Sequence, residues 1–249
     1  MLSIIIPHNH KLSHLKKCLM SITKQTYLPK LETIIIFDKI IHSQKRIEKY
    51  LLLKFKLIGI KVIFNSKSIG VSASRNNGLK LSSFNYVAFQ DSDDEWLPEK
   101  LEIQLKYMLN KKVQFTHSSY LRRELNQKDV KIASGFRKYN KFNVFMSCKI
   151  ATPTVIFNKL FFNEPLFDEK LNFMEDLDFW IQCSKKSNLF GINKTLVIVN
   201  VHKNSSFRKK EYFYKSYLYL TNKYIESFLL RLIYKIFWNT KLLIKDVIS

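Results

Sequence analysis

Three short apolar runs alternate with two helical segments in the first 65 residues, and this order constrains the fold more than any other feature. The runs at residues 2–6, 33–37 and 60–64 have the length and the β-branched content of buried strands. Between them, apolar residues recur at three- and four-residue steps over residues 13–24, and a helical pattern continues over residues 47–54. A β-α-β-α-β order predicts a doubly wound parallel sheet.

A fourth predicted strand, at residues 86–90, follows a loop and helix at residues 70–81 and runs directly into the acidic cluster Asp91-Ser92-Asp93-Asp94. Ligands of open α/β sheets gather at the carboxyl ends of the strands. That edge is where this pattern places Pro7, which is expected to end the first strand, together with Asp38 and the acidic cluster. We therefore expect three segments to converge on one site.

The pattern beyond residue 110 is less regular. It indicates strands at residues 154–157 and 196–201, a helix at residues 176–185, and further helices between residues 211 and 244. The predicted organisation is one sheet domain over residues 1–206 and a basic amphipathic helical tail over residues 207–249.

The charge balance is strongly basic, with 42 Lys and Arg against 20 Asp and Glu and a net charge of +22. Such a field attracts polyanions, although many of these lysines can equally belong to a solvated surface. The three cysteines form neither a disulfide framework nor a metal motif, which fits a reduced cytosol. No apolar run reaches the roughly 18 to 20 residues of a membrane span, so the protein is expected on the cytoplasmic side.

The acidic cluster gathers three carboxylates within four residues, so their mutual repulsion calls for a compensating cation. Carboxylates that share an ion with substrate phosphates are the usual arrangement for Mg²⁺, and Mn²⁺ accepts similar ligands. The alternative is an acidic turn that caps the next helix, because Asp is a good N-cap residue. The D-x-D spacing alone does not decide between the two.

The motifs on both sides of the acidic cluster favour a metal site over a helix cap. The stretches GVSASRNNG and YVAFQDSDDEWLPEKL closely resemble the central signature of family 2 glycosyltransferases, and MEDLDFW resembles the acidic motif downstream. The resemblance implies the GT-A fold, a Rossmann-like, mostly parallel sheet flanked by helices and carrying a D-x-D metal motif, here with a helical extension at the C-terminal side. The matching stretches are residues 3–7, 21–27, 70–78, 86–101, 174–180 and, more weakly, 202–206.

On the donor side, the resemblance implies that Asp93 is the main metal ligand and that Asp91 faces the ribose or the metal. His202 lies where some members supply a histidine to the metal, and Arg75 is expected near the nucleotide or its diphosphate. Asp38 matches an acid that holds the uracil ring. The remaining expected contacts to the nucleotide are Pro7, Asn9 and Ser92.

On the acceptor side, Asp176 matches the general base, and Glu175 beside it is expected to shape the acceptor site. An alternative for this acidic pair is a helix N-terminus that the helix dipole favours. The resemblance implies an inverting transfer from a nucleotide-sugar, expected to be a UDP-sugar, with Mn²⁺ or Mg²⁺ as cofactor. The expected acceptor is a glycan or glycolipid of bacterial lipopolysaccharide or capsule biosynthesis.

Two departures from the family pattern touch the nucleotide-base pocket. Pro7 is usually followed by a small residue, an aromatic residue and Asn, but here by His8, Asn9 and His10. Only one acid, Asp38, remains at the end of the second strand, and the usual glycine turn is absent. A catalytically impaired protein that binds sugar nucleotides or polyanions is therefore the alternative function.

The sequence of the predicted tail indicates a binding partner separate from the substrates. Its apolar residues fall on one helical face with basic residues interspersed, a pattern that suits an anionic membrane surface, or else packing on the domain or on a partner chain. Nucleic acid is not an expected partner, because the aromatic residues lie in apolar segments rather than among basic residues. The apolar residues are Phe228, Leu229, Leu232, Ile233, Ile236 and Phe237.

Overall fold

The computed structural model describes residues 1–39, 41–124, 127–133, 138–141, 143–201 and 210–226. The chain divides into two compact units. The first comprises Met1–Glu169 and Glu175–Lys203, and the second comprises Lys170–Met174 and Asn204–Ser249. The predicted domain boundary at residue 206 lies outside the described residues and stays a prediction.

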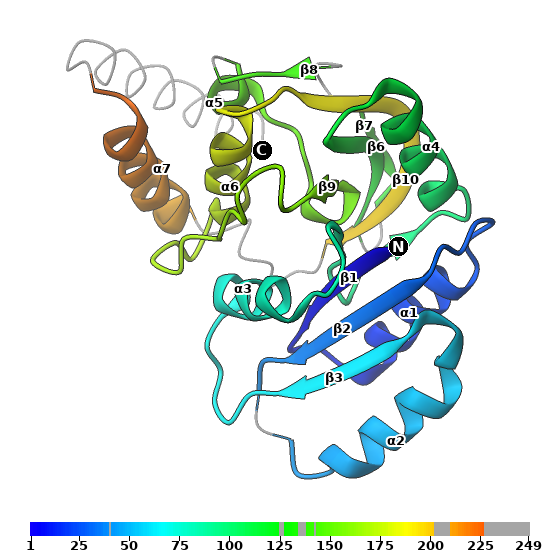
Figure 1. Cartoon of the computed structure of the whole chain (residues 1–249). Coiled ribbons are helices and arrows are strands. Elements are labelled where there is room, and N and C mark those ends of the chain that lie inside the picture. The colour runs from blue at the N-terminus through cyan, green and yellow to red at the C-terminus, as the bar shows by residue number, and fades with distance from the viewer. Residues whose placement is uncertain (40, 125–126, 134–137, 142, 202–209, 227–249) are drawn as a thin grey trace. The chain divides into compact units, whose positions relative to one another are not determined.

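The N-terminal half of the first unit is a parallel α/β layer, as the periodicity predicts (Figure 1). Its four strands lie in the order β3-β2-β1-β4, and every neighbouring pair is parallel. The elements are β1 (Leu2–His8), α1 (Leu12–Thr23), β2 (Leu31–Phe37), α2 (Gln44–Lys54), a short 3-10 helix (Lys56–Ile58), β3 (Ile60–Phe64), α3 (Val71–Leu81) and β4 (Tyr86–Phe89).

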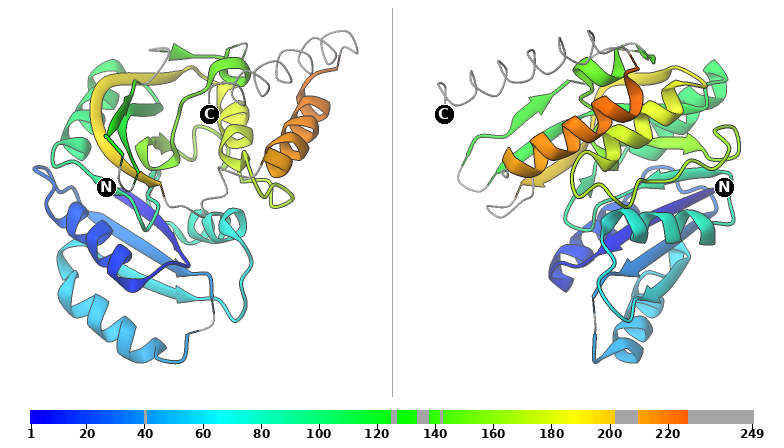
Figure 2. Two further views of the ribbon diagram at one scale, coloured as in Figure 1. Left: turned by 180° about the vertical axis from the view of Figure 1, so that it is seen from behind. Right: turned by 90° about the vertical axis from the view of Figure 1, so that its left-hand side faces the viewer.

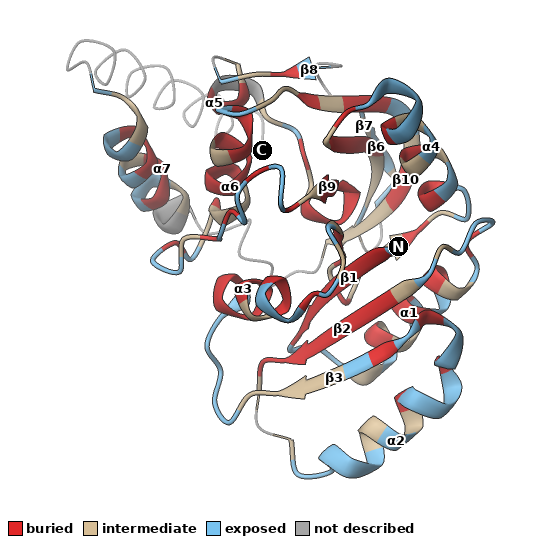
Figure 3. Ribbon diagram, in the orientation of Figure 1, coloured by how far each residue is buried: buried red, intermediate tan, exposed pale blue. Residues whose placement is uncertain are grey.

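Helices cover both faces of these strands, which is why β1 and β2 are buried almost throughout (Figure 3). Seen from behind, α1 and α2 lie over the face opposite to α3 (Figure 2). The glycine Gly78 lets α3 approach closely, because a Cβ atom there would stand 2.4 Å from Cγ2 of Ile5.

Pro7 does not end the first strand, contrary to expectation, because β1 continues to His8. Alternate residues of a parallel strand bond to opposite neighbours. The carbonyl of His8 accepts from Asp38 on the β2 side, whereas the carbonyl of Ile5 accepts from Gln90 on the β4 side. The missing N–H of Pro7 therefore faces the side where pairing with β4 has already ended at Ile5.

The second half of the sheet is mixed, and this arrangement confirms the predicted α/β class while adding antiparallel pairs to the parallel ones. A short strand, β9, runs antiparallel to both β4 and β6, while β10 runs parallel to β6. The elements are β5 (Glu95–Trp96), α4 (Lys100–Lys111), β6 (Phe115–Glu124), β7 (Val130–Ile132), β8 (Lys138–Tyr139), α5 (Val144–Ser147), β9 (Ile156–Asn158), α6 (Glu175–Ser184) and β10 (Leu189–Val201).

Two predicted strands have different bounds from those expected. Thr152–Thr154 forms a 3-10 turn that carries Pro153, so the strand predicted at residues 154–157 begins only at Ile156. The strand predicted at residues 196–201 begins earlier, at Leu189, and continues through two irregularities in its pairing with β6.

The second unit contains the helix α7 (Lys210–Tyr224), whose Phe213 ring lies 5.7 Å from the ring of Phe173. This helix lies where helices were predicted from residue 211 onward, whereas the predicted start of the tail at residue 207 lies outside the described residues. The tail residues predicted to form the apolar face, from Phe228 onward, lie outside the described residues. Within the described part of the chain, no helix is long and apolar enough to cross a membrane.

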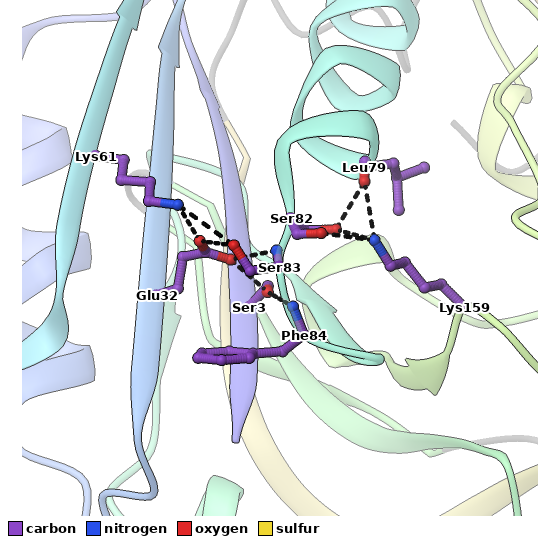
Figure 4. A network of polar contacts seen from close by, with 8 residues as sticks. All are labelled: Ser3, Glu32, Lys61, Leu79, Ser82, Ser83, Phe84 and Lys159. Carbon is purple, nitrogen blue, oxygen red and sulfur yellow. Dashed lines mark hydrogen bonds and ion pairs between the residues drawn. The ribbon is translucent and has the colours of Figure 1, made fainter.

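A polar cluster closes the amino-terminal edge of the parallel strands (Figure 4). The carboxylate of Glu32, at the start of β2, accepts hydrogen bonds of 2.8 Å from the hydroxyl of Ser3 and from both the backbone N–H and the hydroxyl of Ser83. It also pairs with Lys61 of β3. We call Ser3, Glu32, Lys61 and Ser83 the amino-edge cluster.

Candidate functional site

The acidic segment after β4 forms a tight turn that neighbouring strands hold in place. Asn200 at the end of β10 donates its backbone N–H to Oδ1 of Asp94 at 2.8 Å and its side-chain amide to the carbonyl of Asp93 at 2.7 Å. The side chain of Gln90 donates to the carbonyl of Asp94 at 2.8 Å. Burial, together with the carboxylates of Asp91 and Asp93, raises the pKa of Asp94 well above its usual value. Asp94 therefore supports the turn from inside the protein.

Ser92 also points into the protein. It is 1% exposed, and its hydroxyl lies 2.9 Å from Nδ1 of His8. Burial, with the positive charge of Lys39 nearby, lowers the pKa of His8 to about 3, so the imidazole is neutral. His8, one of the departures from the family pattern, is thus a buried support for the acidic turn.

Asp91 and Asp93 are the members of the turn that keep solvent access, with side chains 29% and 15% exposed. Such carboxylates fit the way Mg²⁺ or Mn²⁺ is held, by one or two protein carboxylates together with substrate phosphates. In the described part of the chain, no three His, Cys, Asp or Glu side chains are placed to hold a metal by themselves. His202 lies outside the described residues, and its predicted role as a metal ligand stays a prediction.

Arg75 brings the two predicted acidic motifs together. Its guanidinium, 4% exposed, donates from Nη2 to Oδ1 of Asp91 at 2.8 Å and from Nη1 to Oε1 of Glu175 at 2.9 Å. Burial opposes the charge, but the two carboxylates outweigh it and raise the pKa of Arg75. The ring of Phe167 lies 5.2 Å from the guanidinium carbon. Arg75 thereby joins α3, the turn after β4 and the start of α6.

Asp176 stands beside this ion pair. Burial, and then the carboxylates of Glu175 and Asp91, raise the pKa of Asp176 to about 7, although Arg75 acts in the opposite direction. A carboxylate whose pKa lies near neutral pH is suited to accept a proton in catalysis. We call Arg75, Asp91, Glu175 and Asp176 the carboxyl-edge cluster.

Tyr120 on β6 is a residue at this site that the sequence analysis did not single out. Burial and the nearby Asp176 raise the pKa of Tyr120 to about 12, so its hydroxyl stays protonated. Asn200 was missed as well. Both residues lie in strands of the irregular second half, where no local motif marks them.

Asp38 holds the loop at residues 65–70 through hydrogen bonds. Its carboxylate accepts hydrogen bonds from the side chains of Asn65 and Ser68 at 3.1 and 3.0 Å, and from the backbone N–H groups of Ile69 and Gly70 at 2.7 and 2.9 Å. Burial raises the pKa of Asp38, but these donors outweigh it and lower the pKa. The predicted contact of Asp38 with a uracil ring stays a prediction.

Pro7 and Asn9 lie at the end of β1 and just beyond it. Pro7 is buried, whereas Asn9 is exposed and its backbone carbonyl accepts from Nζ of Lys39 at 3.3 Å. His10 follows, with Nε2 3.7 Å from Oδ2 of Asp93. Their predicted contacts with a nucleotide also stay predictions.

A cavity of about 470 Å³ opens beside Asp93. It is in the size range of small-molecule pockets. Its lining carries both signs of charge, so it is suited to polar ligands. The lining residues are His14, Lys17, Asp93, Glu95, Arg123, Glu124, Gln127, Asp129, Asn200 and Val201.

Comparisons with known proteins address the family and the fold. The sequence model of the protein family described as Glycosyl transferase family 2 matches residues 3–169. An uncharacterized glycosyltransferase of Rickettsia bellii is 36% identical over 202 residues, which is 80% of this chain but 28% of that protein. This chain spans about a third or less of the curated Rickettsia relatives.

A relative of similar length is the Escherichia coli UDP-Glc:alpha-D-GlcNAc-diphosphoundecaprenol beta-1,3-glucosyltransferase WfgD. It is 28% identical over 196 residues, which cover 78% of this chain and 73% of that protein. Among solved structures, S. aureus TarS 1-349 in complex with UDP matches with a TM-score of 0.69 and 19% identity, over 92% of this chain and 68% of that one. The complex of TarS 1-349 with UDP-GlcNAc gives a TM-score of 0.71 at 16% identity, over 92% and 69%. These similarities confirm the GT-A fold.

Proposed function

This chain belongs to glycosyl transferase family 2, and from that premise we propose that it moves a sugar from a UDP-sugar to a hydroxyl of a lipid-linked or polysaccharide acceptor. The observation that carries the proposal is the carboxyl-edge cluster, in which Arg75 joins Asp91 to Glu175 beside Asp176. The names of the relatives support the substrate classes, since WfgD is named for UDP-Glc and a diphosphoundecaprenol acceptor.

Asp91 and Asp93 would hold Mg²⁺ or Mn²⁺ together with the diphosphate of the donor. When bound, the metal supplies positive charge against the negative charge that builds on the leaving diphosphate. Arg75 adds a fixed positive charge at the same edge, and its two carboxylate partners keep it in place.

Asp176 would accept the proton of the acceptor hydroxyl while the acceptor oxygen attacks the anomeric carbon from the face opposite the diphosphate. This course inverts the configuration at that carbon. Glu175 is held by Arg75, which leaves Asp176 as the carboxylate of the pair available for the proton. The raised pKa of Asp176 gives it more basic strength than an ordinary Asp.

The test is a binding and transfer assay with UDP, UDP-Glc and UDP-GlcNAc in the presence of Mn²⁺ and a lipid diphosphate-linked sugar as acceptor. We expect Asp93→Asn to weaken Mn²⁺-dependent binding of the donor, and Asp176→Asn to bind the donor while losing transfer. Glu99→Gln is the matched control, because Glu99 is an exposed acid that pairs with Lys194 away from the cluster. The proposal fails if Asp93→Asn and Asp176→Asn behave like Glu99→Gln.

A catalytically impaired sugar-nucleotide binding protein is the second candidate, and the hydrogen bonding of Asp38 favours it. The four donors of the loop at residues 65–70 occupy the carboxylate that is expected to hold the uracil. In that case any binding of a sugar nucleotide would not depend on Asp38, and neither transfer nor slow hydrolysis would exceed the level of Asp176→Asn.

A further inference from the structure

The segment made of α2 and the 3-10 helix after it carries, on its outer side, the two most exposed large apolar side chains in the described part of the chain. Leu53 is 73% exposed and Leu57, in the 3-10 helix that follows, is 80% exposed, while Leu52 beside them is 43% exposed. The inner side of the same segment holds Leu51, Phe55 and Ile58, which are at most 1% exposed. Figure 3 shows the outer side of α2 largely exposed.

These three leucines have no role in the core, because α2 already buries a separate set of apolar residues against the sheet. Single exposed leucines are ordinary on a protein surface. Three exposed leucines within six residues concentrate apolar surface on one short segment, and concentrated apolar surface is typical of interaction sites.

Positive charge surrounds the patch. Five basic residues lie between positions 45 and 56 and are exposed, whereas Glu48 is the one acid of that segment. At the helical step of 100° per residue, Lys45, Lys49 and Leu52 fall within about 60° of one another on the outer side. We call the outer side the α2 face; its members are Lys45, Arg46, Lys49, Leu52 and Leu53 of α2, with Lys56 and Leu57 of the 3-10 helix that follows.

We propose that the α2 face docks on a membrane surface that contains anionic lipid. Its leucines would enter the boundary between headgroups and acyl chains, and its ammonium and guanidinium groups would lie at the lipid phosphates. A helix with leucines among lysines on its exposed side has the composition of interfacial helices. The net charge of +22 adds long-range attraction to an anionic surface.

Charge also argues against two other occupants. A second copy bound through the same face would bring eight basic residues together, because a two-fold contact places each patch against itself. Nucleic acid would satisfy the basic residues but would leave the three leucines in water. The docking surface is separate from the carboxyl-edge cluster, so this proposal does not depend on the proposed function.

The test is co-sedimentation of the full chain with vesicles of phosphatidylcholine alone and of phosphatidylcholine mixed with phosphatidylglycerol. We expect binding to the mixed vesicles, and a loss of about tenfold in partition coefficient for each leucine removed in Leu53→Ser/Leu57→Ser. The matched control is Leu109→Ser/Leu160→Ser, which removes leucines that are 68% and 52% exposed elsewhere. Lys49→Gln/Lys56→Gln should weaken binding about fivefold per lysine, with less effect at high salt.

A fluorophore attached at the α2 face locates the membrane contact on the protein surface. An environment-sensitive dye on Leu53→Cys should shift to the blue when mixed vesicles are added, whereas the same dye on Leu109→Cys should not. Thermal midpoints of all variants should match the parent, because these side chains are exposed. Unchanged transfer to a water-soluble acceptor would separate this proposal from the catalytic one.

Several results would overturn the proposal. Parent-like vesicle binding of Leu53→Ser/Leu57→Ser would place the contact elsewhere, the C-terminal tail included. Sensitivity to the lysine variants alone, with equal binding to RNA, would indicate general attraction to polyanions. Concentration-dependent dimers that the leucine variants abolish, without vesicle binding, would identify a second copy as the occupant.

Discussion

The two edges of the parallel sheet each hold carboxylates that are at least partly buried, and burial has opposite outcomes there. At the amino edge, burial raises the pKa of Glu32, but hydrogen bonds from Lys61, Ser83 and Ser3 outweigh it and bring the pKa to about 2. At the carboxyl edge, burial and neighbouring acids bring the pKa of Asp176 to about 7. The amino edge provides donors for its acid, whereas the carboxyl edge provides three acids for one arginine.

This difference separates a stabilising cluster from a reactive one. Carboxylates that are fully hydrogen-bonded add stability, while carboxylates that repel one another reduce it and are kept where chemistry needs them. Substitution of a carboxylate should therefore raise stability at the carboxyl edge and lower it at the amino edge, and four variants test this comparison.

Asp176→Asn should give the largest effect. Loss of the proton acceptor should lower kcat of sugar transfer by about 10²- to 10⁴-fold, with little change in donor binding. The stability of the folded protein should increase, in contrast to its activity. The folded state holds its proton between the ordinary pKa of 3.8 and the raised value of about 7, so the parent loses stability as pH rises through that window.

The measurement for this variant is a thermal midpoint of the metal-free protein from pH 4 to pH 8. Asp176→Asn should match the parent at low pH and exceed it by a few degrees at pH 7 and above. A midpoint below that of the parent at pH 8 would contradict the view that Asp176 is destabilising when ionised.

Arg75→Gln should have the next largest effect, because it removes the cation that Asp91 and Glu175 share. Breaking a fully buried ion pair from one side costs about 3 to 5 kcal/mol. We expect a smaller loss here, because Asp91 and Glu175 are 29% and 15% exposed and water partly compensates their charge. We expect a lower urea midpoint with an unchanged denaturant slope, and weaker donor binding. If Glu175→Gln in the same protein restores stability, the loss comes from unpaired carboxylates rather than from lost packing against Phe167.

The sequence predicted one of these edges and not the other. Helical and strand periodicity located the first four strands, and the rule that parallel strands end at one edge placed Pro7, Asp38 and the acidic cluster in one region. Arg75 was expected there only from the family resemblance. The amino-edge cluster carries no sequence motif. Ser3, Glu32 and Ser83 lie far apart in the sequence, and only the pairing of the strands brings them into contact.

The contacts that complete the site depend on long-range packing. Arg75 and Glu175 are 100 residues apart, and Asn200 reaches the acidic turn from β10, so local spacing could not indicate either contact. The antiparallel pairings of β9 were not predicted for the same reason. Those of the short β5 and β8 were not predicted because two residues carry no readable period.

Glu32→Gln should lower stability by about 1 to 3 kcal/mol at neutral pH, because a neutral amide cannot accept the same set of bonds and leaves Lys61 without its charge partner. The stabilisation from Glu32 is complete above its ordinary pKa of 4.5 and is lost as pH falls toward the folded value of about 2. The difference between parent and variant in urea melts should therefore shrink between pH 5 and pH 2. Sugar transfer should be unchanged.

Lys61→Met should have the smallest effect. It separates the contribution of the ion pair from that of the other hydrogen bonds to Glu32. Lys61 is about half exposed, so its ion pair is screened by water, and we expect a loss below about 1 kcal/mol at low salt. Ser3 and Ser83 would still donate three hydrogen bonds to Glu32. The measurement is the urea midpoint at low and high salt. A loss as large as that of Glu32→Gln would show that the lysine, rather than the hydroxyl and backbone donors, makes this edge stabilising, and would narrow the contrast with the arginine-centred cluster at the other edge.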